Sequence, residues 1–438
     1  MNPSTQSQKQ GQIQSSKNVG LYSAIAMSLS GMMGSGLFTI LGYANLTAKS
    51  HFPIAFLLAG VAVLFTVYSC AKLSATFPVA GGPAGYIVST YGSGFISGWM
   101  NTFLYLGFLI STSLYAAGFT EFIVVLTGSF FSSFELKLIG ASLVLILALV
   151  NLLGASIVGL AGLVAIGVVV TSLLAYSGLG LSQLSAASLD FALGPIKGIA
   201  IATGMLYINY QGFAVVSSAA DSMTDPKKTI PRAMMIAVLL SIALYVLVSF
   251  VTIQITPVDI IKANPSNVIG AAANILMGRA GFIGVGVIAL LACAAAVNAT
   301  IFTATKVLGV VVSEHAHAIR LNKALGHSQV RRLLFSASIV IVLVLGFPLE
   351  IVGKMASMAF LLLYGVITYG HIRIHKLTAT NIWVLWCGVV INFALFVFLL
   401  LDGIEADPIA VAFLAIALLV TGLIQLMYQW VPTLGKHH

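Results

Sequence analysis

The stretch that decides the fold is Ser28-Leu29-Ser30-Gly31-Met32-Met33-Gly34-Ser35-Gly36-Leu37-Phe38, in the middle of a hydrophobic run over residues 20–48. A run of this length crosses a bilayer as a helix, because a helix satisfies all of its backbone polar groups internally. Glycine weakens a helix by up to about 1 kcal/mol relative to alanine and tolerates non-helical backbone. Three glycines and two serines fall within the seven residues from Ser30 to Gly36. We therefore predict a membrane-spanning helix that is interrupted at mid-depth.

A second stretch of this kind, Asn209-Tyr210-Gln211-Gly212-Phe213, lies at a comparable depth in the hydrophobic run over residues 195–220. The two stretches are five spans apart, and an odd number of spans reverses the orientation of a helix. Two inverted five-span repeats, whose discontinuous helices meet at mid-membrane, produce this pattern. Helix packing is the alternative interpretation, since small residues such as Gly31 and Ser35 also let two helices approach closely.

The composition sets the class of the whole chain. Of its 438 residues, 59% are hydrophobic and only 7% are charged, far fewer charges than a soluble domain of this length carries. Runs such as Ala141–Leu153 do not alternate polar and apolar residues, so strands of an outer-membrane barrel are not expected. We predict an all-α integral membrane protein with twelve transmembrane helices. Their expected ranges are 20–48, 53–77, 86–117, 136–153, 157–182, 195–220, 232–254, 281–312, 331–347, 349–372, 381–402 and 408–430.

These ranges divide the chain into predicted parts. Residues 20–182 form the first five-helix repeat, 195–372 the second, inverted repeat, and 381–430 two additional helices. Residues 1–19 are rich in Gln and Ser and are expected to be a disordered cytoplasmic tail, and residues 431–438 form a second cytoplasmic tail.

The charge of +9 is explained by topology. With the amino terminus inside, fourteen of the twenty Lys and Arg residues fall on cytoplasmic segments and span ends, as the positive-inside rule requires. Both termini are then cytoplasmic, the location is the inner membrane, and membrane lipid rather than nucleic acid is the expected partner. Cys70, Cys293 and Cys387 are scattered in apolar runs without the spacing of a disulfide framework or a zinc site. No metal and no cofactor are predicted.

The interrupted helices suggest a ligand. The free N–H groups around Gly34, Ser35 and Gly36 would begin the second half of the first span and, with the helix dipole, favour an anion. Free carbonyl groups near Ser30 and over Ile208–Gln211 would attract a cation. An α-amino acid carries both charges on adjacent groups, so this geometry suits a zwitterion.

Four stretches resemble the amino acid–polyamine–organocation (APC) superfamily. Ser28–Phe38 looks like its first-helix signature, and Phe77-Pro78-Val79-Ala80-Gly81-Gly82-Pro83-Ala84-Gly85-Tyr86 resembles its loop before helix 3. Tyr210–Phe213 with Asp225-Pro226-Lys227-Lys228-Thr229-Ile230-Pro231-Arg232-Ala233 resembles its helix 6 and the following loop. Ala296-Val297-Asn298-Ala299-Thr300 is similar to a stretch of its proton-coupled bacterial members. The similarity extends over about residues 20–430.

The resemblance implies a LeuT-type fold, with spans 1–5 and 6–10 as inverted repeats, and a permease rather than an enzyme. It implies that Gly34, Ser35 and Gly36 hold the substrate carboxylate, and that carbonyls near Ser30, Gly31, Ile208 and Gln211 hold the ammonium group. It also implies a side-chain pocket lined by Phe103, Gly107 and Gln211. The helix-8 stretch Cys293–Ala296 lacks the hydroxyls with which some relatives bind sodium, and span 5 lacks the lysine of some proton-coupled relatives. The coupling ion is therefore left open.

The expected substrate is a neutral amino acid, carried by a symporter or exchanger. A charged group at mid-membrane costs at least about 2.5–3.5 kcal/mol, and we find no acidic or basic residue near the two interruptions. Glu121 and Asp221, placed just past the ends of spans 3 and 6, are either a gate or proton relay or solvated helix ends. Asn298 is either a pocket group or a partner in a helix-to-helix hydrogen bond. An amino acid sensor and a transporter of polyamines or organic cations are the alternatives, and the oligomeric state is left open.

Overall fold

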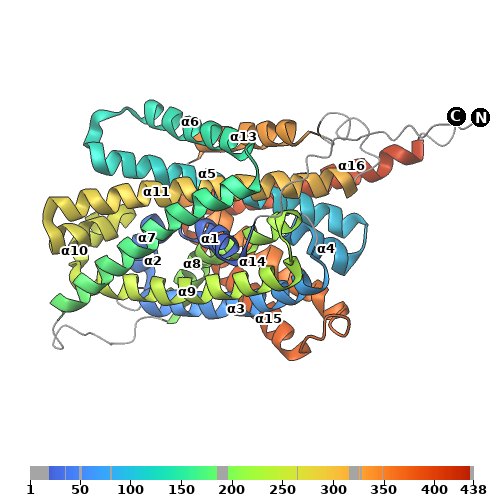
Figure 1. Cartoon of the computed structure of the whole chain (residues 1–438), viewed down its shortest axis with the longest axis horizontal. Coiled ribbons are helices and arrows are strands. Elements are labelled where there is room, and N and C mark those ends of the chain that lie inside the picture. Colours follow the sequence, from blue (N-terminus) through green and yellow to red (C-terminus); the bar gives the residue numbers. More distant parts are fainter. Residues whose placement is uncertain are drawn as a thin grey trace, which may run out of the picture.

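The computed structural model describes residues 19–34, 36–48, 52–78, 81–184, 196–263, 265–314, 325, 328–347 and 349–434. Every regular element among these residues is helical, and most helices run along the long axis of the molecule (Figure 1). Eleven of the described helices are long and apolar enough to cross a membrane, and Leu21–Met32 is a shorter apolar helix. The predicted all-helical membrane fold is confirmed. Ser35, residues 1–18 and residues 435–438, which include most of the predicted tails, lie outside the described residues.

The elements of the first half are α1 (Leu21–Met32), the π-helical turn η1 (Gly36–Ile40), α2 (Leu41–Ala48), α3 (Phe52–Thr76), α4 (Pro83–Tyr91), α5 (Phe95–Thr127), η3 (Gly128–Phe130), α6 (Ser133–Asn151) and α7 (Ala155–Gln183). Those of the second half are α8 (Ile196–Leu206), the 3₁₀ helix η5 (Tyr207–Ser222), α9 (Pro226–Ile255), α10 (Val258–Ala263), η6 (Pro265–Asn267), α11 (Val268–Glu314), α13 (Gln329–Gly346), α14 (Leu349–Arg373), α15 (Ile382–Ala406) and α16 (Pro408–Leu434). The first span is assembled from α1, η1 and α2, so the count of twelve spans stays a prediction.

The first span is interrupted where the sequence predicts it. Helix α1 ends at Met32, and the N–H of Met33 closes its last turn on the carbonyl of Leu29 at 2.8 Å. Regular structure resumes at Gly36, in a π-helical turn rather than an α-helix. A π-turn inside a helix is rare and is frequently found at functional sites.

The sixth span changes its helix type instead of unwinding. Helix α8 ends at Leu206, and the chain continues as a 3₁₀ helix to Ser222, which includes the predicted interruption at Asn209–Phe213. Runs of 3₁₀ helix longer than three or four residues are uncommon, and within a helix they often mark a hinge. The sequence located this irregularity, but its form differs from the unwound segment that we expected.

Both predicted boundaries of the third span are wrong. The third span, expected at 86–117, is divided into α4 and α5, because Gly92 takes a positive φ of 74° and ends α4. Helix α5 then starts at Phe95 and continues to Thr127, so Glu121 lies inside this span and not beyond its end. Span 8, expected at 281–312, corresponds to the part of α11 that follows Gly278, a residue with non-helical backbone (φ 64°) that separates it from the preceding part starting at Val268.

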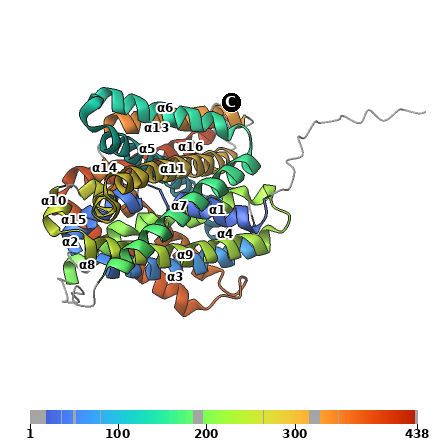
Figure 2. The same ribbon diagram turned by 60° about the vertical axis from the view of Figure 1, so that its left-hand side comes forward.

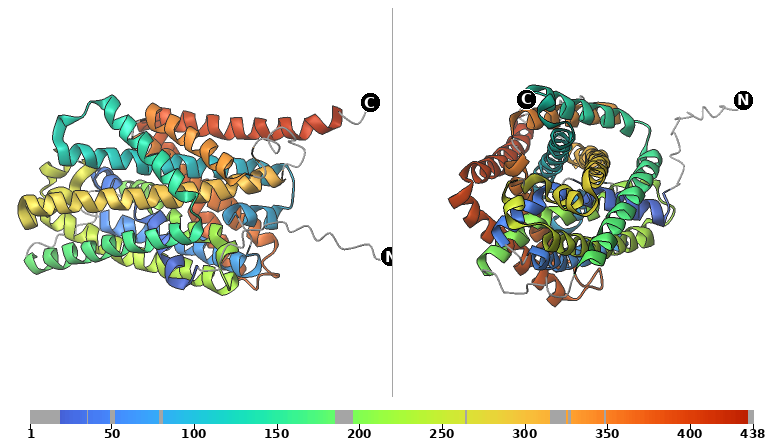
Figure 3. Two further views of the ribbon diagram at one scale, coloured as in Figure 1. Left: turned by 45° about the horizontal axis from the view of Figure 1, so that its top comes forward. Right: turned by 90° about the vertical axis from the view of Figure 1, so that its left-hand side faces the viewer.

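The interrupted spans lie in the core of the bundle. Helix α1 contacts η5, α7, α9 and α11, while α3 packs along α9 and α5 along α11 (Figure 2). Within span 6, Ile196–Ser222, 89% of the residues in an 18-residue apolar stretch are buried, against 33% in a stretch of the same length in α7. Figure 3 shows the bundle from two further directions, one of them along its length. The backbones of α1 and η5 cross at Gly31 and Gly212, where a Cβ atom on Gly212 would collide with the backbone of Gly31 and Met32. Only glycine permits so close an approach.

Candidate functional site

The interruption of the first span is enclosed by three other spans. A Cβ atom on Gly34 would lie 2.6 Å from the Cβ of Ala296 in α11 and 2.7 Å from the ring of Tyr115 in α5. A Cβ atom on Gly36 would collide with the side-chain oxygen of Asn209 in η5. The bare backbone of the interruption is therefore in direct contact with the irregular part of span 6, as the sequence predicts for two interrupted helices that meet.

Tyrosine hydroxyls donate hydrogen bonds to backbone carbonyl groups around the interruption. Tyr115 donates a hydrogen bond to the carbonyl of Gly31 at 3.1 Å, and Tyr364 of α14 donates to that of Gln211 at 3.2 Å. Tyr245 of α9 donates to the carbonyl of Asn209 at 3.4 Å. Carbonyl groups without a partner are costly in a membrane, so these bonds stabilise the irregular backbone. Gly31 and Gln211 are two of the predicted ammonium-binding positions.

Several buried polar atoms near the interruption have no hydrogen-bond partner among the described residues. They are the hydroxyl of Ser30, both side-chain polar atoms of Asn209 and the side-chain oxygen of Gln211. The side-chain nitrogen of Gln211 donates to the hydroxyl of Tyr115 at 3.2 Å. A buried polar group without a partner costs about 1–3 kcal/mol, and such groups concentrate at functional sites. These four atoms lie near the place where the two interrupted spans meet, and further buried polar atoms without a described partner occur elsewhere in the bundle, for example at Asn101 and Thr256.

The predicted positions on span 3 lie elsewhere. Phe103 is fully buried in α5, and a Cβ on Gly107 would face Phe360 and Leu363 of α14. Gly107 is eight residues before Tyr115, about 12 Å along the helix axis. The structure thus brings together Gly31, Gly34, Gly36 and Gln211. Ile208 is fully buried and precedes Asn209 in the chain. Phe103 and Gly107 have no described contact with the interruption. Their assignment to a pocket stays a prediction.

The two acidic residues differ in their surroundings. Asp221 lies at the end of η5 and pairs with Lys306 of α11 across 3.8 Å, and its side chain is 56% exposed. The carbonyl of the neighbouring Ser222 accepts a hydrogen bond from the N–H of Val19 at 3.2 Å. This hydrogen bond connects the residues before α1 with the end of span 6. Glu121 is partly buried within α5. Gate or relay roles for both stay predictions.

Asn298 makes a hydrogen bond between helices. Its side-chain oxygen accepts from the side-chain nitrogen of Asn151, at the end of α6, at 2.6 Å. Two residues further along α11, Thr300 accepts from Thr112 of α5 at 3.0 Å. The helix-to-helix alternative for Asn298 is therefore the one that the structure shows. Among the described residues, no group of three or more His, Cys, Asp or Glu side chains is placed to hold a metal ion.

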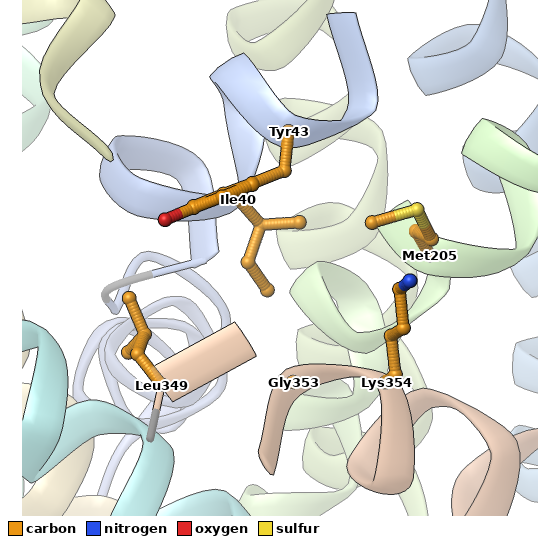
Figure 4. A pocket seen from close by; sticks show the side chains of 6 residues that line it. All are labelled: Ile40, Tyr43, Met205, Leu349, Gly353 and Lys354. Carbon is orange, nitrogen blue, oxygen red and sulfur yellow. The ribbon is translucent and has the colours of Figure 1, made fainter. Parts of the chain in front are cut away.

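A small cavity lies beyond the interruption, on the side of η1 and α2 (Figure 4). It is lined by Ile40 and Tyr43 of the first span, Met205 of α8, and Leu349, Gly353 and Lys354 of α14. Its volume of about 10 Å³ suffices for one water molecule. The Lys354 side chain is almost fully buried, and its amine pairs with the carboxylate of Asp407, between α15 and α16. This pair links span 10 to the last two helices.

Neutralising one member of this pair is expected to destabilise the fold. In Asp407→Asn, the amine of Lys354 stays buried without its counter-charge, whereas in Lys354→Met/Asp407→Leu neither charge remains. Because Asp407 is a quarter exposed, we expect a loss of about 1–2 kcal/mol for the single variant, less than for a fully buried pair. Thermal unfolding in detergent measures it. A double variant less stable than the single one would show that the pair is not the source of the effect.

Sequence reasoning missed the residues that complete this site. The sequence pattern assigns no role to Asn209 and Tyr210, and none to Tyr115, Tyr245 or Tyr364. Among the described residues, the six largest fully buried side chains are all tyrosines: Tyr86, Tyr115, Tyr207, Tyr210, Tyr245 and Tyr364. Tyrosine in membrane proteins is enriched at the interfaces, so a tyrosine in the middle of a span is a signal that could have identified these residues.

Comparison with known proteins agrees with this architecture. The chain is 24% identical over 377 residues to the inner membrane transport protein YbaT of Escherichia coli, covering 86% of this chain and 88% of that protein. It is 26% identical over 284 residues to the serine/threonine exchanger SteT of Bacillus subtilis, covering 62% and 63% of the two chains. The manganese transporter of Eremococcus coleocola, solved as a mutant, superposes with a TM-score of 0.61 over 93% of this chain and 92% of its own, at 12% identity. That last likeness shows the fold alone.

The family comparison covers nearly all of the chain. The model of the family described as amino acid permease matches residues 19–430, from the start of α1 into α16. This range contains both interrupted spans and all four stretches that resemble the superfamily. The protein is a multi-pass membrane transporter with the LeuT-like fold, and it belongs to the amino acid permease family.

Proposed function

We propose that this protein is a secondary transporter of neutral amino acids, a symporter or exchanger that works by alternating access around the interrupted spans 1 and 6. The observation that carries the proposal is the close approach of the Gly36 backbone to the side chain of Asn209, beside buried polar atoms that have no partner among the described residues. On the predicted topology both termini are cytoplasmic and the protein lies in the cell membrane.

The two ends of an amino acid have partners of complementary polarity at this place. Backbone N–H groups at Gly34 and Gly36 favour a carboxylate. The carbonyl of Gly31, in the last turn of α1, accepts one tyrosine hydroxyl and has a second lone pair with which it can bind an ammonium group. The carbonyl of Gln211 lies within the 3₁₀ helix η5 and accepts the hydroxyl of Tyr364, so we assign it to the ammonium side on the family resemblance. We assign Ser35 to the carboxylate and Ser30 and Ile208 to the ammonium side on the family resemblance.

Charge supports a neutral side chain. Among the described residues, no Asp or Glu is buried, and Lys354 and His371 are the only buried basic residues. The charge of Lys354 is balanced by Asp407, and both ring nitrogens of His371 have hydroxyl partners, Ser69 at 2.8 Å and Thr378 at 2.8 Å. A cationic or anionic substrate side chain would need an opposite charge near the interruption. SteT, a relative named for serine and threonine exchange, agrees with this substrate class.

A thermal-shift scan of the twenty amino acids on the purified protein tests the proposal. A ligand that binds only the folded state stabilises it by about 2.7 kcal/mol at 100 times its Kd, so we expect alanine, serine or leucine to raise the apparent Tm by a few degrees. In Gly36→Ala, whose new Cβ would collide with Asn209, this response should be lost. Gly284→Ala, where a Cβ meets nothing within 4 Å, is the control and should respond like the wild type.

Three results would contradict parts of this proposal. Stronger stabilisation by arginine or glutamate would refute the neutral class, and a shift by polyamines alone would refute amino acids as substrates. Binding of amino acids without uptake into proteoliposomes, with or without a proton gradient, would favour a sensor over a transporter.

A further inference from the structure

A basic hollow lies at one end of the seam between α3 and α9, away from the interrupted spans. It has a volume of about 420 Å³ and includes Lys72 of α3 together with Lys227, Lys228 and Arg232 of α9. Lys228 pairs with Asp225 at 3.3 Å, and no other ion pair of these four side chains is found among the described residues. The hollow therefore carries a surplus of about three positive charges, counting Asp225, that the transport mechanism proposed above does not use.

The depth of the hollow corresponds to the lipid headgroups. Helix α9 begins at Pro226, and its lipid-facing part starts one turn after Arg232, where Ile236, Leu239 and Leu240 are all exposed. Exposed large apolar side chains on a membrane-spanning helix face acyl chains. The basic residues thus lie at the boundary between headgroups and hydrocarbon, and on the predicted topology this is the cytoplasmic face.

The apolar surface continues from the hollow along the same face of α9. Arg232, Met235, Leu239, Ile242 and Val246 follow one another at helical spacings of three and four residues. Ile242 and Val246 line a second, apolar hollow of about 340 Å³ between α3 and α9. Ile242 is ten residues beyond Arg232, about 15 Å along the helix axis, which is half of the hydrocarbon thickness. A molecule with an anionic head and a long apolar tail matches this arrangement.

We propose that the Lys72–Lys227–Lys228–Arg232 hollow is a binding site for the phosphate headgroup of an anionic phospholipid, whose acyl chains lie along the exposed face of α9. Basic pockets between transmembrane helices on the cytoplasmic side recognise such headgroups through their negative charge. Arg232 can bind two phosphate oxygens with its planar fork, and the three lysines add point charges. A soluble phosphate shares the charge and the oxygen atoms of the headgroup but has no acyl chain that could contact the apolar face.

The test is a titration of the purified full-length protein in a neutral detergent, with thermal stability as the readout. Three probes are compared: short-chain phosphatidylglycerol, phosphatidylcholine of the same chain length, and inorganic phosphate. We expect saturable stabilisation by phosphatidylglycerol and none by phosphatidylcholine, with inorganic phosphate at least tenfold weaker. Equal effects of the two phospholipids would overturn the proposal, and inorganic phosphate as potent as phosphatidylglycerol would overturn the lipid as occupant.

A matched pair of variants locates the site. Arg232→Gln should raise the phosphatidylglycerol concentration needed for half-saturation about fivefold, which corresponds to the contribution of one basic residue near a membrane surface. Arg331→Gln also removes one positive charge, but from the start of α13, which packs against α5, α6 and α11. This variant should leave the half-saturating phosphatidylglycerol concentration unchanged. Both side chains are exposed, so neither variant is expected to impair folding. Equal weakening in both variants would show attraction by overall charge and would refute a local site.

Discussion

Gly212→Ala is expected to remove most of the folded transporter. Its new Cβ would collide with the carbonyl carbon and oxygen of Gly31 and the nitrogen of Met32. These are backbone atoms of an element held between α7, α9 and α11, so they cannot move aside as the end of a side chain can. Overpacking a core costs typically 1–3 kcal/mol and occasionally more; because two backbones meet here, we expect about 3 kcal/mol or more. The yield of monodisperse protein and its apparent Tm measure the effect.

The matched control is Gly167→Ala, in the interior of α7. A Cβ there meets nothing within 4 Å, and alanine favours a helix by up to about 1 kcal/mol over glycine. This variant should melt at or above the wild-type temperature and transport normally. If Gly212→Ala behaved in the same way, the close crossing of α1 and η5 would be refuted, and with it the argument that both interrupted spans share one site.

The sequence predicted the first interruption because its cause is local. Three glycines within seven residues weaken the helix through their own backbone freedom, a property that does not depend on the neighbouring helices. The membrane class of the chain followed in the same way from the length of its hydrophobic runs and its low content of charged residues. The conformation of the sixth span could not be predicted in this way, because a glycine at position 212 allows both an unwound turn and the close approach of another helix. The structure shows the close approach to Gly31, so the packing interpretation holds for this pair of glycines.

The span 3 assignments could not be derived from the sequence, because they depend on which turn of α5 faces α1. The range predicted for this span began nine residues too early, since Gly92–Gly94 lies in a hydrophobic region and its break was overlooked. Tyr115, and not a residue near Gly107, is the α5 side chain at the interruption. Its two hydrogen-bond partners are 84 and 96 residues away in the chain, a distance over which local patterns carry no information.

Tyr115→Phe is expected to weaken substrate binding roughly 30-fold, which corresponds to about 2 kcal/mol. The hydroxyl of Tyr115 donates to the carbonyl of Gly31 at 3.1 Å and accepts from the side-chain nitrogen of Gln211 at 3.2 Å. It thereby fixes two positions to which we assign the substrate ammonium group. Phenylalanine keeps the ring against Gly34 but leaves both partners without this bond in a buried place, at about 1–3 kcal/mol for each such group. The amino acid concentration that gives half-saturation, in the thermal-shift titration and in uptake assays, measures the change.

Tyr105→Phe is the matched control for this prediction. Tyr105 lies on the same helix, and its hydroxyl bonds the hydroxyl of Ser336 in α13 at 3.0 Å, away from the interruption. Both variants lose one buried hydroxyl, so both are expected to melt somewhat lower, but only Tyr115→Phe should change the affinity for amino acids. Tighter binding in Tyr115→Phe would have a different meaning. The hydroxyl would then compete with the ammonium group for the Gly31 carbonyl, so that the substrate displaces Tyr115 and does not share the carbonyl with it.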